Sequence, residues 1–241
     1  MTSVNQCISL MNKFRIVIAV VLACIFVHTI DRSFAAEKKY QFTHDWVSDH
    51  APVWIKHLQE FKGKPNIRAL EIGTFEGRGA IWFLENILTD PTSSITCIDV
   101  FGDYGGPFEH RYDHNIKVSG FSHKVKKIKG SSQTVLRTLE PNSYDFIYID
   151  GSHVAKDVLM DAVLSWDLLK VGGIIIFDDY RWHEHDMGRW ARPQIAIDAF
   201  LHVFKPYTEV RHKEYQIVVK KKDEPNSDFL AYFGEEPGQL R

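Results

Sequence analysis

Short apolar runs alternate with amphipathic stretches along most of the chain. The runs are rich in β-branched residues, which is typical of buried strands, and they lie at 69–72, 95–100, 125–128, 146–149 and 174–177. Helical periodicity separates them over 79–87, 133–139 and 156–169, and less clearly over 112–120. Strands that alternate with helices in this way predict a parallel sheet with right-handed crossovers.

The flanks of this pattern complete the predicted domain. Helical spacing extends over 40–61, where Asp49 can cap a helix and Pro52 suits its first turn. After the fifth run, 195–204 predicts one more helix and 208–220 a closing pair of strands. We therefore expect a single α/β domain over 40–222, Rossmann-like and doubly wound, with a mainly parallel sheet and a closing antiparallel strand. A polar tail follows at 223–241.

The N-terminal segment differs from the rest in kind. An uninterrupted apolar run from Ile16 to Val27 follows Lys13 and Arg15 and precedes the small residues of 33–36. This pattern predicts a signal peptide within 1–36. An uncleaved membrane anchor is the alternative, although the run is short beside the ~20 residues of a membrane span. Either one predicts export or membrane association, whereas a start site downstream would leave the domain in the cytoplasm.

Composition and charge narrow the function classes. A chain of 241 residues with 44% hydrophobic and 25% charged residues can bury a full core. The formal net charge of -2 gives no basic footprint for nucleic acid. Cys7 and Cys24 lie in the leader, so a processed chain keeps Cys97 alone, which excludes an internal disulfide and a metal–thiolate site. Cys97 lies within an apolar run and is expected to be a buried, inert thiol.

The first predicted strand leads into a glycine-rich turn, EIGTFEGRG, at residues 71–79. Gly73 and Gly77 allow a tight turn and a close backbone approach to a ligand. Phe75 and Arg78 stand where a dinucleotide fingerprint has glycine, so a dehydrogenase is the least favoured interpretation. Glu71, two residues before the first glycine, suits a cationic ligand better than a diphosphate.

Polar residues also follow the second and third strands. Asp99 ends the second strand, where a carboxylate can accept hydrogen bonds from ribose hydroxyls. Ser132 and Gln133 follow the third strand, where an adenine ring would reach. Helix capping explains the serines of this segment equally well.

Three carboxylates follow two more strands: Asp150 in the stretch YIDGSH, and the pair Asp178 and Asp179. Adjacent strands lie ~5 Å apart, so these groups can converge, and hard oxygen ligands suit magnesium. Turn chemistry is the alternative for each aspartate taken singly. The following HEHD stretch at 183–186 is more typical of an exposed polar loop than of a metallohydrolase, and this loop can line an acceptor pocket together with Arg181, Trp182 and Trp190.

The order of these motifs over 67–180 resembles the class I S-adenosylmethionine-dependent methyltransferases. The closest likeness is to the catechol O-methyltransferase-like group and its bacterial relatives that methylate small molecules and sugars. The resemblance implies S-adenosylmethionine (SAM) as cofactor. Its implied contacts are Glu71, Gly73, Asp99, Ser132 and Gln133, with Phe75 and Gly77 shaping the methionine end.

The resemblance also implies a metal and a base. Mg²⁺ or another divalent cation would be held by Asp150, Asp178 and Asp179, where the family has Asp, Asp and Asn. His153 stands where the family has a catalytic lysine, so Asp150 and His153 are the expected catalytic residues. An imidazole can take the substrate proton, ligate the metal or cap the following helix, and these three roles stay open.

The expected function is metal-assisted O-methylation of a hydroxyl on a small molecule or glycan. A metal-dependent hydrolase or hydroxylase, and a catalytically silent ligand-binding domain, are the alternatives. The acceptor and, through the N-terminal segment, a membrane are the expected partners, and a homodimer stays open. One conflict remains, because SAM is made in the cytosol and the leader directs the chain out of it.

Overall fold

The computed structural model describes residues 39–102, 106–182, 188 and 190–223. The predicted signal peptide or anchor, the HEHD stretch and all but the first residue of the polar tail lie outside these residues. The chain divides into Met1–Lys39 and Tyr40–Arg241, and every described helix and strand belongs to the second unit. None of the described helices is long and apolar enough to cross a membrane.

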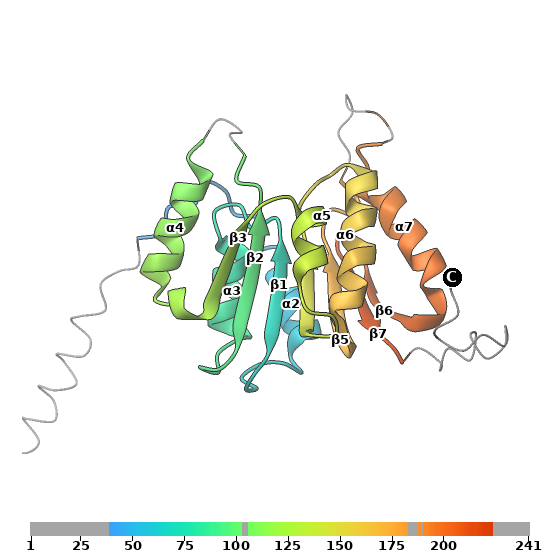
Figure 1. Ribbon diagram of the computed structural model, residues 1–241, viewed down its shortest axis with the longest axis horizontal. Coiled ribbons are helices and arrows are strands. Elements are labelled where there is room, and N and C mark those ends of the chain that lie inside the picture. The colour runs from blue at the N-terminus through green and yellow to red at the C-terminus, as the bar shows by residue number, and fades with distance from the viewer. Residues whose placement is uncertain (1–38, 103–105, 183–187, 189, 224–241) are drawn as a thin grey trace, which may run out of the picture. The chain divides into compact units, whose positions relative to one another are not determined.

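A seven-stranded sheet forms the centre of the Tyr40–Arg241 unit, with the strand order β3-β2-β1-β4-β5-β7-β6 (Figure 1). Pairing is parallel from β3 through to β5, and β7 runs antiparallel to both β5 and β6. This confirms the predicted mainly parallel sheet and its closing pair of strands. The strands are β1 Arg68–Ile72, β2 Ser94–Asp99, β3 Val125–Lys129, β4 Tyr144–Ile149, β5 Leu169–Phe177, β6 Thr208–Lys213 and β7 Ile217–Lys221.

Helices cover both faces of the sheet, as a doubly wound fold requires (Figure 1). One face packs against α2, α3 and α4, and the other against α5, α6 and α7. Ile174 and Ile176 of β5 belong to the first core, whereas Ile175 and Phe177 belong to the second, and all four are fully buried. A strand buried on both faces appears in the sequence as one continuous apolar run. The helices are α2 Ala51–Leu58, α3 Arg78–Asn86, α4 Phe108–Ser119, α5 Ser132–Val135, α6 Ala155–Leu168 and α7 Pro193–Val203.

The helix predicted over 40–61 is shorter in the structure, which has α2 alone there. The residues before it are held by side chains from elsewhere in the fold. Glu76 accepts hydrogen bonds from the backbone N–H of Thr43, at 2.7 Å, and from its hydroxyl, at 3.0 Å. Asn115 accepts the N–H of Gln41 at 2.6 Å. Because these backbone donors have tertiary partners, residues 40–46 follow an irregular path across the ends of the strands. We call residues 40–50 the N-terminal strap.

Candidate functional site

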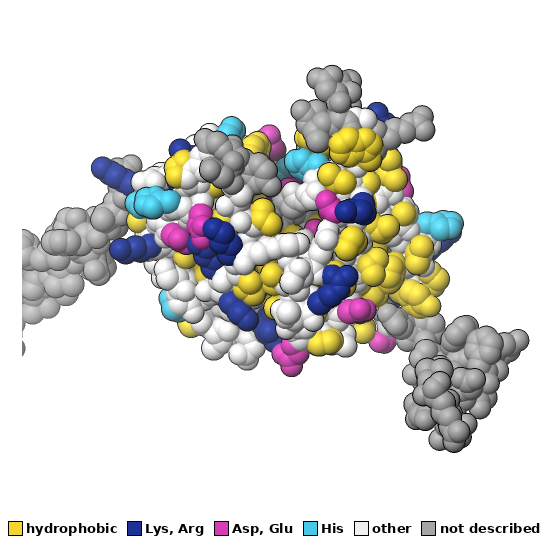
Figure 2. All heavy atoms as spheres, turned by 45° about the horizontal axis from the view of Figure 1, so that its top comes forward, with side chains coloured by type: hydrophobic (Ala, Val, Ile, Leu, Met, Phe, Trp, Pro, Cys, Tyr) yellow, Lys and Arg dark blue, Asp and Glu magenta, His cyan; other side chains and the backbone are white. Residues whose placement is uncertain are grey.

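A cavity of about 800 Å³ opens at the carboxyl ends of β1, β2, β4 and β5. The cavity lies over the switch point of the sheet, between β1 and β4, where open α/β sheets bind ligands. Figure 2, with this end of the sheet turned toward the viewer, shows histidine and acidic side chains there among apolar ones. Every predicted cofactor, metal and catalytic residue lines the cavity except Gly77.

The turn after β1 requires glycine at its first position. Gly73 has φ +84°, and a Cβ there would lie 1.8 Å from the backbone oxygen of Asp150. The ends of β1 and β4 therefore touch, which no other residue would permit. Gly77 also has a positive φ and packs under the Tyr112 ring, so its role is to position α3.

Asp99 fixes the backbone on both sides of the part of the cavity where the cofactor is expected. Its Oδ2 accepts the N–H of Phe75 at 2.9 Å, and its Oδ1 accepts the N–H of Phe101 at 2.7 Å. Both phenylalanines have positive φ, at 48° and 45°, a strained conformation that persists where the surroundings enforce it. Each carboxylate oxygen keeps a further lone pair, so the predicted contact with ribose hydroxyls remains open to Asp99.

Glu71 lies beneath the glycine turn and is only 1% exposed. Its Oε2 accepts a hydrogen bond from the Thr74 hydroxyl, and its Oε1 lies 2.4 Å from the position of a Cβ on Gly79. Burial raises the pKa of Glu71 to about 8. At neutral pH the side chain is therefore mainly protonated in the absence of a cationic neighbour.

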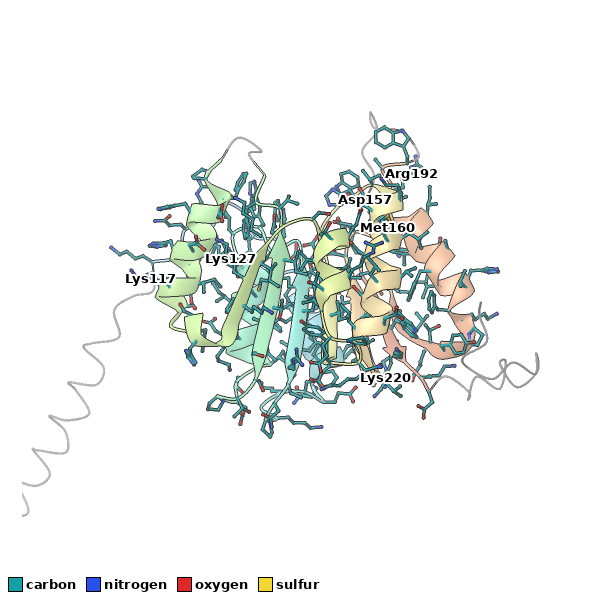
Figure 3. The ribbon with its side chains drawn as sticks, in the orientation of Figure 1. Lys117, Lys127, Asp157, Met160, Arg192 and Lys220 are labelled. Carbon is teal, nitrogen blue, oxygen red and sulfur yellow. The ribbon has the colours of Figure 1, made fainter. Side chains whose placement is uncertain are left out.

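Ser132 and Gln133 begin α5 and line the far side of the cavity. Gln133 Nε2 donates to Asp157 Oδ1 at 2.8 Å, and Figure 3 shows Asp157 on α6 at the end of the helix near the cavity. The Ser132 hydroxyl pairs with Asp161, whose pKa burial raises to about 6. Ser131 takes the N-cap position without a side-chain cap bond, so capping does not account for that serine.

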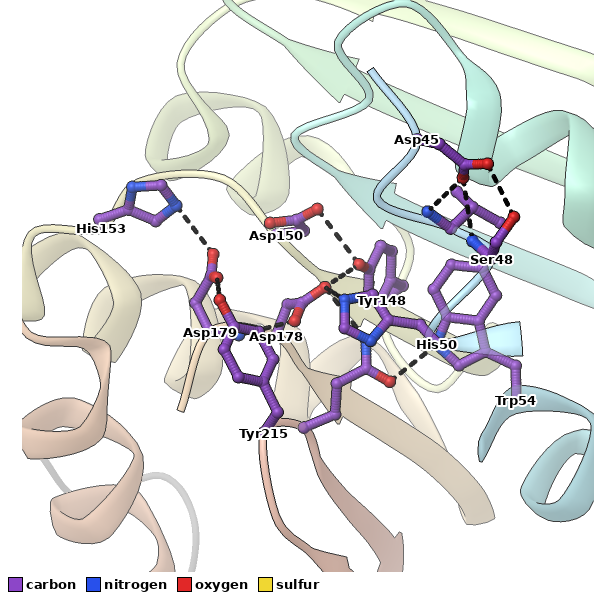
Figure 4. Close-up of polar contacts among 12 residues, drawn as sticks. Asp45, Ser48, His50, Trp54, Tyr148, Asp150, His153, Asp178, Asp179 and Tyr215 are labelled. Carbon is purple, nitrogen blue, oxygen red and sulfur yellow. Dashed lines mark hydrogen bonds and ion pairs between the residues drawn. The ribbon is translucent and has the colours of Figure 1, made fainter. Parts of the chain in front are cut away.

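The three predicted carboxylates meet at the other end of the cavity (Figure 4). Ligand atoms of Asp150, His153 and Asp179 lie within 4.8 Å of one another, which fits one metal ion. His153 Nε2 lies 2.8 Å from Asp179 Oδ2, and the Tyr215 hydroxyl donates to Asp179 Oδ1 at 2.8 Å. Asp179 follows the end of β5 with a positive φ, 59°, which turns the backbone and lets the adjacent aspartates make different contacts.

Asp178 lies behind this cluster, with its oxygens already occupied by protein donors. Its Oδ2 accepts the Tyr148 hydroxyl and Gln216 Nε2, the latter at 3.0 Å, and its Oδ1 accepts the Asp179 N–H at 2.7 Å. His50 Nε2 lies 3.8 Å from the same carboxylate. The geometry thus groups His153, rather than Asp178, with Asp150 and Asp179.

The charges in the cluster are unevenly compensated. Burial, with Asp178 and Asp179 nearby, raises the pKa of Asp150 well above its usual range. Burial also raises the pKa of Asp178. Burial acts in the same direction on Asp179, but its hydrogen bonds with His153 and Tyr215 outweigh it and lower the pKa. Without a cation, Asp150 therefore favours its protonated form, whereas Asp179 favours the ionised form.

Sequence reasoning missed the residues that support the carboxylates. His50 reaches Asp178 from the strap and stacks on Tyr215 at 5.6 Å between ring centroids. Trp54 Nε1 donates to Gln216 Oε1 at 3.0 Å, which fixes the amide that holds Asp178. His50 and Trp54 lie 128 and 124 positions before Asp178, and Tyr215 and Gln216 come from the segment between β6 and β7, so no local pattern marks them. Of the loop residues expected at an acceptor pocket, Trp182 lines the cavity and contacts His153, whereas Arg181 and Trp190 do not line it.

The sheet order, the glycine turn after β1 and the carboxylate at the end of β2 define the class I methyltransferase fold. Comparison with known proteins agrees: the family described as a methyltransferase domain matches residues 70–180. An uncharacterized protein of Acanthamoeba polyphaga mimivirus is 30% identical over 158 residues, which are 64% of this chain and 70% of the viral protein. The fold and the family match identify a SAM-dependent methyltransferase domain in this chain, and O-methyltransferases are among the proteins that it resembles.

Other relatives are more distant. A probable caffeoyl-CoA O-methyltransferase of Dictyostelium discoideum is 28% identical over 135 residues, so the match spans about half of each chain, 54% in both cases. Among solved structures, a putative O-methyltransferase from Klebsiella pneumoniae has a TM-score of 0.56 at 18% identity, covering 76% of this chain and 84% of that one. An O-methyltransferase of tomaymycin synthesis from Streptomyces achromogenes, solved with SAM, has a TM-score of 0.54 at 16% identity, covering 73% and 80%. These structures share the fold.

Proposed function

We propose that this protein transfers the methyl group of SAM to a hydroxyl of a small molecule or glycan, with the help of a divalent cation. One observation carries the proposal: a single cavity is lined both by the glycine turn with Asp99 and by Asp150, His153 and Asp179. A methyl donor and an acceptor hydroxyl held at these two ends would face each other across the same space. Such positioning is a large part of catalysis in a bimolecular transfer.

The cofactor end offers contacts for the ribose and the adenine of SAM. The backbone around Gly73 permits close approach, and the Asp99 carboxylate can accept hydrogen bonds from the ribose. Gln133 donates through Nε2 to Asp157, so its Oε1 is available to accept a hydrogen bond from an exocyclic amine. Ser132 lines the same wall.

The acidic end fits a divalent cation. Two carboxylates and an imidazole lie close enough to bind one ion, and the high pKa of Asp150 reflects charge that a cation would compensate. A bound cation would acidify and orient an acceptor hydroxyl. Without a cation, His153 is the group placed to accept the hydroxyl proton, and with one it would serve as a ligand. Asp178 holds Tyr148 and Gln216 in either case.

The name of the Dictyostelium relative, a probable caffeoyl-CoA O-methyltransferase, supports an oxygen acceptor. Residues 16–27 support our proposal that the domain is exported or anchored to a membrane, with a signal peptide favoured over an anchor. A location outside the cytosol would require a supply of SAM there.

Calorimetric titration of the full-length protein with SAM, followed by assays on a panel of hydroxylated acceptors with Mg²⁺, with Mn²⁺ and with EDTA, tests the proposal. We expect SAM to bind, Asp99→Ala to abolish binding, and EDTA to depress turnover. Glu140→Gln, at an exposed site beside the amino-terminal end of β1, is the matched control and should behave as wild type. Binding of metal without binding of SAM would favour the hydrolase or hydroxylase alternative. Full turnover in EDTA would leave His153 as a metal-free base.

A further inference from the structure

Acids on α6 hold the wall of the cavity beside α5. Gln133 Nε2 donates to Asp157 Oδ1 at 2.8 Å, and the Ser132 hydroxyl pairs with Asp161, one helical turn further along α6. Ser132 and Gln133 both line the cavity. Both polar side chains of this wall therefore direct a donor to α6, which leaves oxygen atoms to meet a ligand.

Asp157 is itself fixed on its other side. Its Oδ2 accepts the Ser152 hydroxyl at 3.1 Å, and the oxygen of that hydroxyl accepts the Val154 N–H at 3.1 Å. The two oxygens of this carboxylate thus bind two different loops. One loop follows β3 and carries Gln133, and the other follows β4 and carries His153. The carboxylate therefore has a defined orientation at the cavity wall.

The Asp157 carboxylate determines which end of the Gln133 amide faces the ligand. An ionised carboxylate accepts hydrogen bonds and donates none, whereas an amide has an acceptor oxygen and a donor nitrogen. The amide must therefore turn its nitrogen to Asp157. Among the described residues, no donor reaches Gln133 Oε1. The amide thus offers an acceptor, and not a donor, to a base in the cavity.

Two purines differ at the position that this acceptor would meet. Adenine has an amine at C6, which donates a hydrogen bond, whereas hypoxanthine has a carbonyl there, which accepts one. We propose that Asp157 is a positioning residue that fixes the orientation of the Gln133 amide, so that the cofactor site selects an aminopurine over an oxopurine. This inference rests on the proposed use of SAM and on the place of its adenine beside Gln133.

The size of the effect follows from one pair of hydrogen-bonding groups. S-adenosylhomocysteine (SAH), the demethylated product, and its deaminated counterpart S-inosylhomocysteine (SIH) share everything except the base. With SIH, the C6 carbonyl would face Gln133 Oε1, and two acceptors would lose one hydrogen bond and stay unpaired. We therefore expect the wild type to bind SAH about 10–100-fold more tightly than SIH.

Asp157→Asn should relax this preference. The oxygen of the introduced amide can accept the Ser152 hydroxyl, and its nitrogen can donate to Gln133 Oε1. The Gln133 amide can then turn over and present Nε2 to the base, which suits a carbonyl. We expect the preference for SAH to fall by about tenfold or more. If Asp157 served only to stabilise the first turn of α6, its loss would weaken both ligands alike and leave the ratio unchanged.

Calorimetric titration of the full-length protein with SAH and with SIH gives the ratio of the two Kd values without a methyl acceptor or a metal. Asp167→Asn makes the same change at an exposed position near the other end of α6, and this control should keep the wild-type ratio. Asp157→Asn combined with Gln133→Glu exchanges the amide and the carboxylate. An acceptor oxygen then faces the base again, so this double variant should regain the preference for SAH.

The outcomes separate this inference from the proposed function. Equal Kd values for SAH and SIH in the wild type would overturn the inference while leaving cofactor binding intact, and this result needs no variant to fold. An unchanged ratio in Asp157→Asn would overturn the role of Asp157. Failure of the wild type to bind either SAM or SAH would overturn the proposed function together with the inference.

Discussion

Replacement of Asp150 by asparagine should stabilise the protein in the absence of metal while removing its response to metal. Ligand oxygens of Asp150 and Asp179 lie within 4.8 Å of each other, and Asp178 is linked to Asp150 through the Tyr148 hydroxyl. Asparagine has nearly the same shape, and its Oδ1 can still accept the Tyr148 hydroxyl. The substitution therefore removes a charge and retains the packing.

The size of the effect follows from the charge separation. Two carboxylates within 4.8 Å of each other repel by at least ~3.5 kcal/mol at an effective dielectric constant of ~20. Protonation of Asp150 and the His153 contact with Asp179 already relieve part of this repulsion. We therefore expect Asp150→Asn to raise the free energy of unfolding by about 1–3 kcal/mol at pH 8, which corresponds to roughly 2–10 °C in Tm for a domain of this size.

The sign of the pH dependence is fixed by the raised pKa of Asp150. The native state keeps this proton to a higher pH than the unfolded chain does, so the stability of the wild type falls as pH rises above about 4 and continues to fall until the raised folded pKa is passed. The asparagine variant lacks this term. The stability difference between the two proteins should therefore be small near pH 4 and grow toward pH 8.

Thermal unfolding between pH 5 and pH 8, in EDTA and in millimolar Mg²⁺ or Mn²⁺, tests these expectations. Asp145→Asn is the matched control at the opposite end of β4, because Asp145 accepts the Arg68 N–H and Lys170 Nζ, each at 2.8 Å, and its loss should destabilise the protein. The reasoning is refuted if Asp150→Asn lowers Tm in EDTA as the control does. It is also refuted if the variant keeps the full rise in Tm that the cation gives the wild type.

Two further substitutions test the backbone of the site. Gly73→Ala places a Cβ 1.8 Å from the backbone oxygen of Asp150. We therefore expect the free energy of unfolding, measured with denaturant, to fall by at least about 3 kcal/mol. A variant as stable as the wild type would show that β1 and β4 do not meet in this way. Glu76→Gln weakens the hydrogen bonds that Glu76 accepts from the Thr43 N–H and hydroxyl, and it removes the ion pair with Arg111. We therefore expect limited proteolysis to cut the strap several-fold faster while the stability of the core is unchanged. An unchanged cleavage rate would contradict this anchoring.

The sheet was predictable because its central strands are buried on both faces. Residues 146–149 and 174–177 have the continuous apolar sequence that such strands require, and each run ends at an aspartate that marks the carboxyl end. The start of β5 was not predictable in this way. It begins at Leu169 and includes Gly172 and Gly173, and its register against β4 shifts between Tyr144 and Phe146. Glycines interrupt the apolar pattern that indicates a strand, and a register shift leaves no mark in the sequence.

For the strap, the sequence predicted a helix that the structure does not have. Its spacing of apolar residues satisfies a helix, yet Glu76 and Asn115 supply acceptors to its backbone N–H groups, and these contacts join residues 33 and 74 positions apart. His50 reaches Asp178 for the same tertiary reason. A local pattern describes what a segment can form by itself, and it contains no information about partners that only the completed sheet brings near.

The acids of the cavity divide into two kinds, and this division could not be predicted from the sequence. Asp99, Glu76 and Asp178 each accept two or more hydrogen bonds or ion pairs from the protein, and so hold the turn, the strap and the end of β5 in place. Glu71 and Asp150 have few donors and no cationic partner among the described residues, and both have raised pKa values. Burying an unpaired charge costs free energy, so a buried acid without a partner in the protein is expected where a bound cation supplies the opposite charge. The two acids stand at different ends of the cavity, and under the proposed function a cationic group of the ligand and a metal ion would supply the compensating charge.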